Sequence, residues 1–186
     1  HWKNKTILMM QGIGINPGRG GLELLETMRY LQGNYHLVFI GGGTQWDAIV
    51  QKRSEWQLED KVDMIGKQPP ARLKEYTPLA HLGFSLDGSE NINFLYNLPN
   101  KIFDYIHAGV PVAATDIPEV RKIIEQYHCG ICFKSNRPQS MAEEITALMN
   151  DPLRYMALRN NTAPAAKELC WEKERMKLMP IFEPYL

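Results

Sequence analysis

The amino-acid sequence predicts a doubly wound α/β domain with a parallel sheet and a helical C-terminal tail. Short apolar runs alternate with segments of helical periodicity between residues 6 and 133. This alternation is typical of βαβ units, in which crossover helices cover both faces of a parallel sheet. The chain has 186 residues, of which 44% are apolar and 23% charged, so it can bury one full hydrophobic core.

Six apolar runs are predicted as strands, because each is short and bounded by glycine or polar residues. They cover residues 6–12, 36–43, 62–66, 81–86, 110–115 and 129–133. The segments between most of these runs, and the segment after the last, have the apolar spacing of helices. Helices are therefore expected at 21–31, 45–56, 70–80, 100–108 and 119–127, and from 140 onwards to 186.

Three helix starts carry side chains of the type that caps the first free amides. The predicted N-caps are Asn100, Asp116 and Ser140. Asp116 and Ser140 each stand three residues before a glutamate, which is the spacing of a capping box. Pro152 follows the end of the helix that Ser140 is expected to begin, and no strand signal comes after it.

The composition argues against several classes of protein. The 21 basic residues are balanced by 21 acidic ones, whereas a sequence-independent nucleic-acid binder normally has a basic excess. No apolar run is long enough to predict a transmembrane helix. Three cysteines form a poor disulfide framework and indicate a reducing compartment, so we expect a cytoplasmic protein. We interpret the C-x-x-C pair Cys129 and Cys132 as part of a buried strand, with a zinc or redox site as the alternative.

The loop 11–21 follows the first predicted strand and contains five glycines, which allow a close backbone approach to a ligand. Pro17 interrupts the spacing of a dinucleotide site, and the Gly-Lys-Ser/Thr ending of a P-loop is absent. Arg19 stands at the entry to a helix, where a guanidinium and free amides together suit a phosphate. The alternative is that the glycines only form turns and that Arg19 is solvated.

A second glycine run, 41–43, follows the second predicted strand. A dinucleotide site would carry its ribose-binding acid at this point, and none is present. For Gly42 and Gly43 we favour a tight turn. The alternative is a loop that is kept small so that a ligand can lie across it.

The segment 94–115 places polar residues at the start of a helix that leads into a buried strand. Pro99 precedes the helix, whose first amides are unpaired and positively polarised. Lys101 is unfavourable at that end of an isolated helix but suits a bound anion. Asp104 lies on the same face one turn later, where it either accepts hydrogen bonds from a ribose diol or forms a salt bridge with Lys101. Phosphate on the helix start and ribose on the acid together predict a nucleotide pocket.

Three sequence blocks carry a resemblance to a known family: GINPGRGGLELL, LPNKIFDYIHAGVPVAATDIPEV and CGICF. They resemble the C-terminal half of a GT-B glycosyltransferase and, more narrowly, family 4 of the nucleotide-sugar-dependent transferases. The resemblance covers nearly the whole chain, including the tail CWEKERMKLMPIFEPY. It implies a Rossmann-like nucleotide-sugar-binding domain over residues 1–170 and a C-terminal helix over 171–186. That helix is expected to return to an N-terminal domain that this sequence does not contain.

The resemblance also implies roles for individual residues. Phosphate contacts in the family come from a basic residue in the first loop and from the start of the helix in the PNK block, and an acid in that helix binds ribose. The base is bound after the third strand, and the transferred sugar lies near the residues that precede the PNK block. These positions correspond to Gly14, Arg19, Asn100 and Lys101 for the donor diphosphate, Asp104 for ribose, Gly66, Lys67 and Gln68 for the base, and Tyr96 and Asn97 for the sugar.

The chain departs from the family pattern at two places. Tyr96 occupies the position of a glutamate near the transferred sugar, and Ile13 and Gly14 stand where an arginine is usual. No D-x-D sequence occurs, so neither a metal nor any other cofactor is expected. Fixed positive groups and amides would then stabilise the leaving diphosphate.

The expected function is that of the donor-binding domain of a glycosyltransferase, and the resemblance implies a retaining hexosyltransferase of polysaccharide biosynthesis. Its substrate would be a nucleoside-diphosphate sugar, and a saccharide or lipid-linked acceptor would be held by the N-terminal domain. This fragment alone is expected to be inactive, and peripheral membrane association is compatible with the sequence. The alternatives are half of a GT-B nucleotide-sugar epimerase and a nucleotide-binding module without chemistry.

Overall fold

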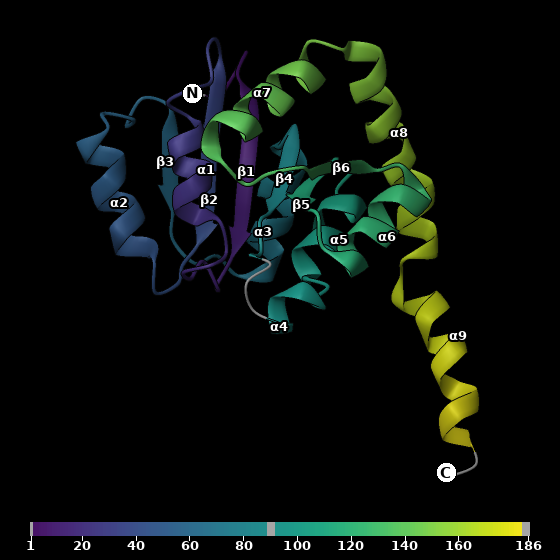
Figure 1. The fold of residues 1–186 in the computed structure, drawn as a ribbon. Coiled ribbons are helices and arrows are strands. Elements are labelled where there is room, and N and C mark those ends of the chain that lie inside the picture. The colour runs from purple at the N-terminus through teal and green to yellow at the C-terminus, as the bar shows by residue number, and fades with distance from the viewer. Residues whose placement is uncertain (1, 89–91, 184–186) are drawn as a thin grey trace.

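The computed structural model of the chain describes residues 2–88 and 92–183. Its core is a six-stranded parallel sheet with the strand order β3-β2-β1-β4-β5-β6 (Figure 1). This confirms the predicted doubly wound α/β fold. The strands are β1 Thr6–Gly12, β2 Tyr35–Gly41, β3 Val62–Ile65, β4 Leu82–Ser85, β5 Val112–Thr115 and β6 Gly130–Phe133.

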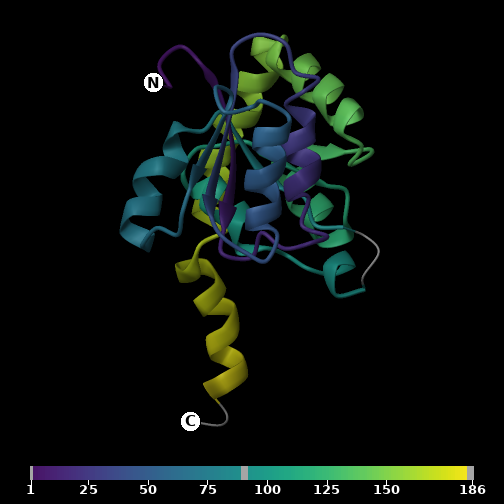
Figure 2. The same ribbon diagram turned by 90° about the vertical axis from the view of Figure 1, so that its left-hand side faces the viewer.

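Helices cover both faces of the sheet (Figures 1 and 2). Buried side chains place α1, α2 and α7 on one face and α3, α5 and α6 on the other, while α8 packs against both hydrophobic clusters. The helices are α1 Gly21–Thr27, α2 Trp46–Glu55, α3 Pro70–Tyr76, the 3-10 turn η1 Thr77–Leu79, α4 Ile92–Leu95, α5 Asn100–His107, α6 Pro118–Tyr127, α7 Pro138–Met149, α8 Pro152–Glu168 and α9 Trp171–Phe182.

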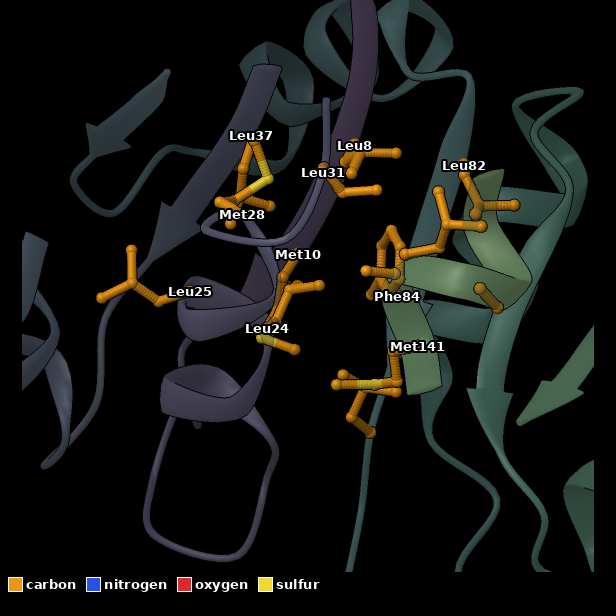
Figure 3. Close-up of a cluster of buried hydrophobic side chains, with 14 of the residues drawn as sticks. Leu8, Met10, Leu24, Leu25, Met28, Leu31, Leu37, Leu82, Phe84 and Met141 are labelled. Atoms are coloured by element: carbon orange, nitrogen blue, oxygen red, sulfur yellow. The ribbon is translucent and has the colours of Figure 1, made fainter. Parts of the chain in front are cut away.

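The central strand β1 shows why the strands read as continuous apolar runs. Leu8 and Met10 point into the cluster under α1 and α7, whereas Ile7 and Met9 point into the cluster under α5. Because successive side chains of a strand face opposite sides, a sheet covered on both faces needs apolar residues at every position. Figure 3 shows the first cluster, whose labelled members are Leu8, Met10, Leu24, Leu25, Met28, Leu31, Leu37, Leu82, Phe84 and Met141.

The sheet has its topological switch between β1 and β4. These neighbouring strands lead into helices on opposite faces, since α1 follows β1 and α5 follows β4. The loops that leave the two strands therefore diverge and open a crevice at the carboxyl edge of the sheet. Ligands of doubly wound proteins bind in such a crevice.

The predicted helix caps were wrong. The N-caps are Pro99 for α5, Ile117 for α6 and Arg137 for α7, and none of them makes a side-chain capping bond. In α6 and α7 a proline begins the helix, where its fixed φ is favourable and its missing N–H costs nothing. Asp116 instead pairs with Arg121, and Ser140 lies inside the first turn of α7.

The segment after Pro152 is helical, as predicted, and forms the two helices α8 and α9. Asp151 caps α8 by accepting from the Arg154 amide at 3.0 Å, so Pro152 begins a new helix. All twelve residues of α9 are exposed, and both views show α9 projecting away from the sheet and its covering helices (Figures 1 and 2). Residues 184–186 of the expected tail lie outside the described residues. In the part of the chain that the structure describes, no helix combines the length and apolarity needed to cross a membrane.

Candidate functional site

The loop after β1 is held against the loop after β4 by direct backbone contacts. The Gly88 amide donates to the Gly18 carbonyl at 2.7 Å. Gly20 has a φ of 72°, and a Cβ added there would lie 2.2 Å from the Cβ of Leu86. Only glycine fits at such a position. The glycine-rich sequence thus brings Arg19 next to the residues that follow β4.

Arg19 is fixed on two sides. Its Nη1 donates to Oδ1 of Asp87 at 2.7 Å, and its guanidinium carbon lies 4.4 Å from the centroid of the Phe94 ring. Asp87 is 1% exposed, and its other oxygen accepts from Nδ2 of Asn97 at 3.2 Å. The interpretation of Arg19 as a freely solvated side chain is therefore wrong.

Helix α5 is anchored at the switch by Tyr105. The Tyr105 hydroxyl accepts from the Gln11 amide at 3.1 Å and can donate to the carbonyls of Met9 and Phe84, which lie 3.2 and 3.3 Å away. Its ring occupies the space in which a side chain at Gly83 would stand. These contacts hold α5 across β1 and β4, and Lys101 lies about one turn before Tyr105 in the same helix.

Lys101 is half-buried beside Arg19. Burial lowers the pKa of the Lys101 ammonium, the charge of Asp87 opposes that shift, and the charge of Arg19 adds to it. Neither an ion pair nor a hydrogen bond to the Lys101 ammonium is found among residues 2–88 and 92–183. A cation in this state is well suited to accept an anion from solution.

Asp104 does not form the salt bridge with Lys101 that was the alternative to ribose binding. Its Oδ2 accepts from Nε2 of Gln11 at 3.3 Å, and Oε1 of Gln11 in turn accepts from the Thr77 hydroxyl at 2.9 Å. Gln11 is 1% exposed, whereas Asp104 is exposed. The buried Gln11 side chain therefore orients the Asp104 carboxylate, which remains accessible to solvent.

Two adjoining cavities lie over this arrangement. The smaller, of about 260 Å³, is lined by the loop 11–14 together with Arg19, Leu73, Asn100, Lys101 and Asp104. The larger, of about 840 Å³, shares Gln11, Ile13, Leu73 and Asp104 with it and extends between α3 and α5. The larger cavity has room for a drug-sized ligand, and the smaller one adds a cationic end.

Most of the predicted site residues meet at these cavities. Gly14, Arg19, Asn100, Lys101 and Asp104 line the smaller cavity, and Gln68 lines the larger one.

The other predicted residues do not line either cavity. Gly66 and Lys67 are exposed just after β3, and Gly66 accepts from the Gln68 side chain at 3.2 Å through its carbonyl. Tyr96 is 63% exposed beyond α4, and Asn97 is turned toward Asp87.

Sequence reasoning missed Asp87 and Gln11. Asp87 follows the end of β4 by two residues, so its place at the carboxyl edge of a strand was a usable signal. Gln11 is the one polar residue between Ile7 and Gly12 in β1, and this break in an apolar run was a second signal.

The glycines at and just after the end of β2 allow close backbone packing. A Cβ at Gly41 would stand 1.9 Å from the Gly12 carbonyl oxygen, and one at Gly43 would stand 2.2 Å from the Ile15 carbonyl oxygen. The two glycine-rich loops are also joined by hydrogen bonds, among them Thr44 N to Asn16 Oδ1 at 2.9 Å. Glycine is therefore required at position 43 by the close approach of the Ile15 backbone and not by a left-handed turn.

The two cysteines of the C-x-x-C pair are protonated at neutral pH. Burial raises the pKa of the Cys129 thiol to about 11 and that of the Cys132 thiol to about 12. Thiols in this state are neither good nucleophiles nor ready metal ligands. No group of three or more His, Cys, Asp or Glu side chains that could hold a metal ion is found in the described ranges 2–88 and 92–183.

The fold matches several solved structures. HepE from Anabaena in complex with UDP aligns over 98% of this chain, with a TM-score of 0.84 and 14% identity. Sucrose-phosphate synthase from Thermosynechococcus elongatus aligns over 98%, with a TM-score of 0.81 and 18% identity. WaaG, a glycosyltransferase involved in lipopolysaccharide biosynthesis, aligns over 89%, with a TM-score of 0.68 and 18% identity. The aligned parts are 50%, 46% and 44% of these proteins, so the chain spans about half their length.

At the level of sequence, no curated protein matches the chain. The family model described as "Glycosyl transferases group 1" matches residues 15–168, which include Arg19, Lys101 and Asp104. Because this match covers far more than half of the 186 residues, the chain belongs to the group 1 glycosyl transferases.

Proposed function

We propose that this chain is the donor-binding domain of a glycosyltransferase and that it binds a nucleoside-diphosphate sugar. The observation that carries the proposal is the pair of cations, Arg19 from the loop after β1 and Lys101 from the first turn of α5, which line one cavity together with Asp104. Membership of the group 1 glycosyl transferases supports it. HepE, which shares the fold, has been solved with UDP and with UDP-glucose.

The diphosphate is assigned to the smaller cavity. Arg19 and Lys101 supply positive charge, and the amides of Asn100 and Lys101 at the helix start supply donors that the helix leaves unpaired. The backbone at Gly14 is open to an approaching ligand, since no atom lies within 4 Å of a Cβ built there. Fixed cations of this kind would stabilise the diphosphate as it leaves the sugar, without a metal or another cofactor.

The nucleoside is assigned to the larger cavity. Asp104 is assigned to the ribose diol, because it lines both cavities, and Gln68 is assigned to the base. Gly66 and Lys67 line neither cavity, so their backbone is assigned only to a part of the base that extends beyond the larger cavity. The transferred sugar then lies toward Tyr96 and Asn97, on the far side of the diphosphate. In this arrangement the nucleotide runs along the carboxyl edge of the sheet, across the switch point.

The acceptor, a saccharide or a lipid-linked sugar, is assigned to an N-terminal domain outside this sequence. Residues 171–186 are assigned to the contact with that domain, and Trp171, Met176, Ile181 and Phe182 are each more than half exposed along α9. Burying such side chains against a partner domain is favourable. We further propose that the protein belongs to family 4 of the nucleotide-sugar-dependent transferases, that it transfers the sugar with retention of configuration in polysaccharide biosynthesis, and that it is cytoplasmic.

Tyr96 favours a second candidate, a nucleotide-binding module without transfer. A tyrosine cannot replace a carboxylate as a charged partner of the sugar hydroxyls. If this module binds nucleotides but the full-length protein neither transfers nor hydrolyses any donor, the second candidate is correct. An epimerase would instead convert the sugar of the free donor, which a product analysis of the same reaction detects.

The experiment that tests the proposal is a calorimetric titration of the chain with UDP, GDP and ADP and with their nucleosides. We expect one diphosphate to bind clearly more tightly than its own nucleoside and more tightly than the other two diphosphates. Failure of all three diphosphates to bind in preference to their nucleosides would contradict a nucleotide-sugar site.

A further inference from the structure

Asp87 is an unexpected residue beside a site for an anion. Its carboxylate is 1% exposed and lies directly behind Arg19, one of the two cations assigned to the diphosphate. A fixed negative charge so close to bound phosphate repels it. By charge alone, Asp87 weakens the binding of the proposed ligand.

The geometry around Asp87 gives the carboxylate a different use. One oxygen holds Nη1 of Arg19 at 2.7 Å, and the other is held by Nδ2 of Asn97 at 3.2 Å. The Phe94 ring lies against the guanidinium at 4.4 Å from its centroid. The carboxylate is therefore itself oriented, and it fixes the guanidinium through a charged hydrogen bond.

The guanidinium keeps donors for a ligand. Arginine has five N–H groups in a planar fork, and the bond to Asp87 uses Nη1. Arg19 lines the smaller cavity together with Lys101 and Asn100, whereas Asp87 is not among the lining residues. The carboxylate thus stands behind the cation, and the cation faces the cavity.

We propose that Asp87 is a positioning residue, which holds Arg19 in the orientation that receives the donor diphosphate. This inference rests on the proposed function. A free arginine side chain loses rotamer freedom when it binds phosphate, and Asp87 removes that freedom before the ligand arrives. The gain from this preorganisation exceeds the repulsion between Asp87 and the phosphates.

The two effects of Asp87 have opposite signs, which makes the inference testable with Asp87→Asn. This variant removes the charge but keeps the size of the side chain. If repulsion dominated, the variant would bind nucleoside diphosphate more tightly. Immobilising one long side chain costs about 0.5–1.5 kcal/mol, and the relieved repulsion offsets part of that cost, so the inference predicts binding that is weaker by up to about tenfold.

A double-mutant cycle separates positioning from a general loss of structure. Asp87→Asn, Arg19→Ala and the double variant are titrated with the tightest-binding of UDP, GDP and ADP and with its nucleoside. If Asp87 acts through Arg19, Asp87→Asn weakens diphosphate binding in the wild-type background and has no weakening effect in the Arg19→Ala background. Nucleoside affinity stays the same in all four proteins.

The outcomes are distinct. Tighter or equal diphosphate binding by Asp87→Asn overturns the inference and leaves the proposed function standing, as does an equal weakening in both backgrounds. If the wild-type chain shows no preference for a diphosphate over its nucleoside, the proposed function fails and the inference fails with it.

Should Asp87→Asn not fold, Asn97→Ala takes its place in the cycle, because it removes the hydrogen bond that orients the Asp87 carboxylate and keeps the carboxylate itself. A smaller loss that depends on Arg19 is then expected, and no loss overturns the inference.

Discussion

At the residue scale, the site depends on two charged side chains, of which Lys101 is unfavourably placed without a ligand. Lys101 is a half-buried cation at a helix start, next to a second cation. Asp104 is an exposed acid that Gln11 orients. Each has a consequence that can be measured.

The lowered pKa of Lys101 predicts how diphosphate binding depends on pH. The pKa is lowered mainly by burial, and a bound diphosphate raises it again because an anion favours the ammonium. Above pH ~7.5, where the terminal phosphate is fully ionised, affinity should therefore fall as the pH rises through the lowered pKa of Lys101, with proton uptake on binding. Calorimetry in two buffers of different ionisation enthalpy measures that uptake.

The same shift predicts the stability of the ligand-free protein. Between the lowered pKa and the ordinary lysine pKa, the unfolded chain binds more protons than the folded one, so the free energy of unfolding rises with pH there. Lys101→Arg, which stays protonated, is the control and should lose both pH dependences. Diphosphate affinity that increases with pH in the wild-type chain would contradict the assignment of Lys101.

Asp104 should discriminate ribose from deoxyribose. A hydrogen bond to a charged group contributes roughly 1.5–3 kcal/mol, so the 2′- and 3′-deoxy nucleotides should bind more weakly than the ribonucleotide. Asp104→Ala should bind all of them with the same reduced affinity. Asp116→Ala, which removes an acid outside both cavities, is the matched control and should keep the discrimination. Discrimination that survives in Asp104→Ala would place the ribose elsewhere.

At the element scale, the strands were predictable and the details of the site were not. The parallel sheet is buried on both faces, so the strands are mostly apolar runs that the sequence shows directly. The contact between Arg19 and Asp87 joins residues 68 positions apart and depends on how two loops pack. No local pattern records such a contact. The caps predicted for α6 and α7 failed for a local reason, because Pro118 begins α6 two residues after Asp116 and Pro138 begins α7 two residues before Ser140.

The packing of the loop after β1 predicts that two glycine substitutions change the free energy of unfolding by very different amounts. Gly20→Ala forces a left-handed φ on alanine and overlaps Leu86, so it should lower the free energy of unfolding by roughly 1–3 kcal/mol or more and weaken diphosphate binding. Gly14→Ala, in the same loop but in open space, should change stability by less than about 0.5 kcal/mol. Urea denaturation compares the two. Equal losses of stability would mean that the loop is not held by the contact at Gly20.

At the scale of the whole molecule, the chain spans about half the length of the solved structures that share its fold. A complete sheet with two hydrophobic clusters should fold alone. We therefore expect the 186 residues to bind nucleotide but to transfer no sugar, because the acceptor is assigned to another domain. An assay with radiolabelled nucleotide sugars and a panel of acceptors checks this, with donor hydrolysis measured in parallel. Robust transfer by the chain alone would show that its domain boundary has been misassigned.

The central claim is that a diphosphate binds between Arg19 and Lys101, and a titration of Lys101→Ala with nucleoside, monophosphate and diphosphate at two ionic strengths tests it most directly. Removing a cation from the start of α5 relieves about 0.3–1 kcal/mol of unfavourable helix-dipole interaction, so the ligand-free melting temperature should not fall. Diphosphate affinity should drop by about ten- to hundredfold, nucleoside affinity should hardly change, and the loss should shrink as salt rises. The exposed Lys122, replaced by alanine as a control, should change none of these affinities. Equal losses for all three ligands in Lys101→Ala, or a large drop in its melting temperature, would contradict the claim.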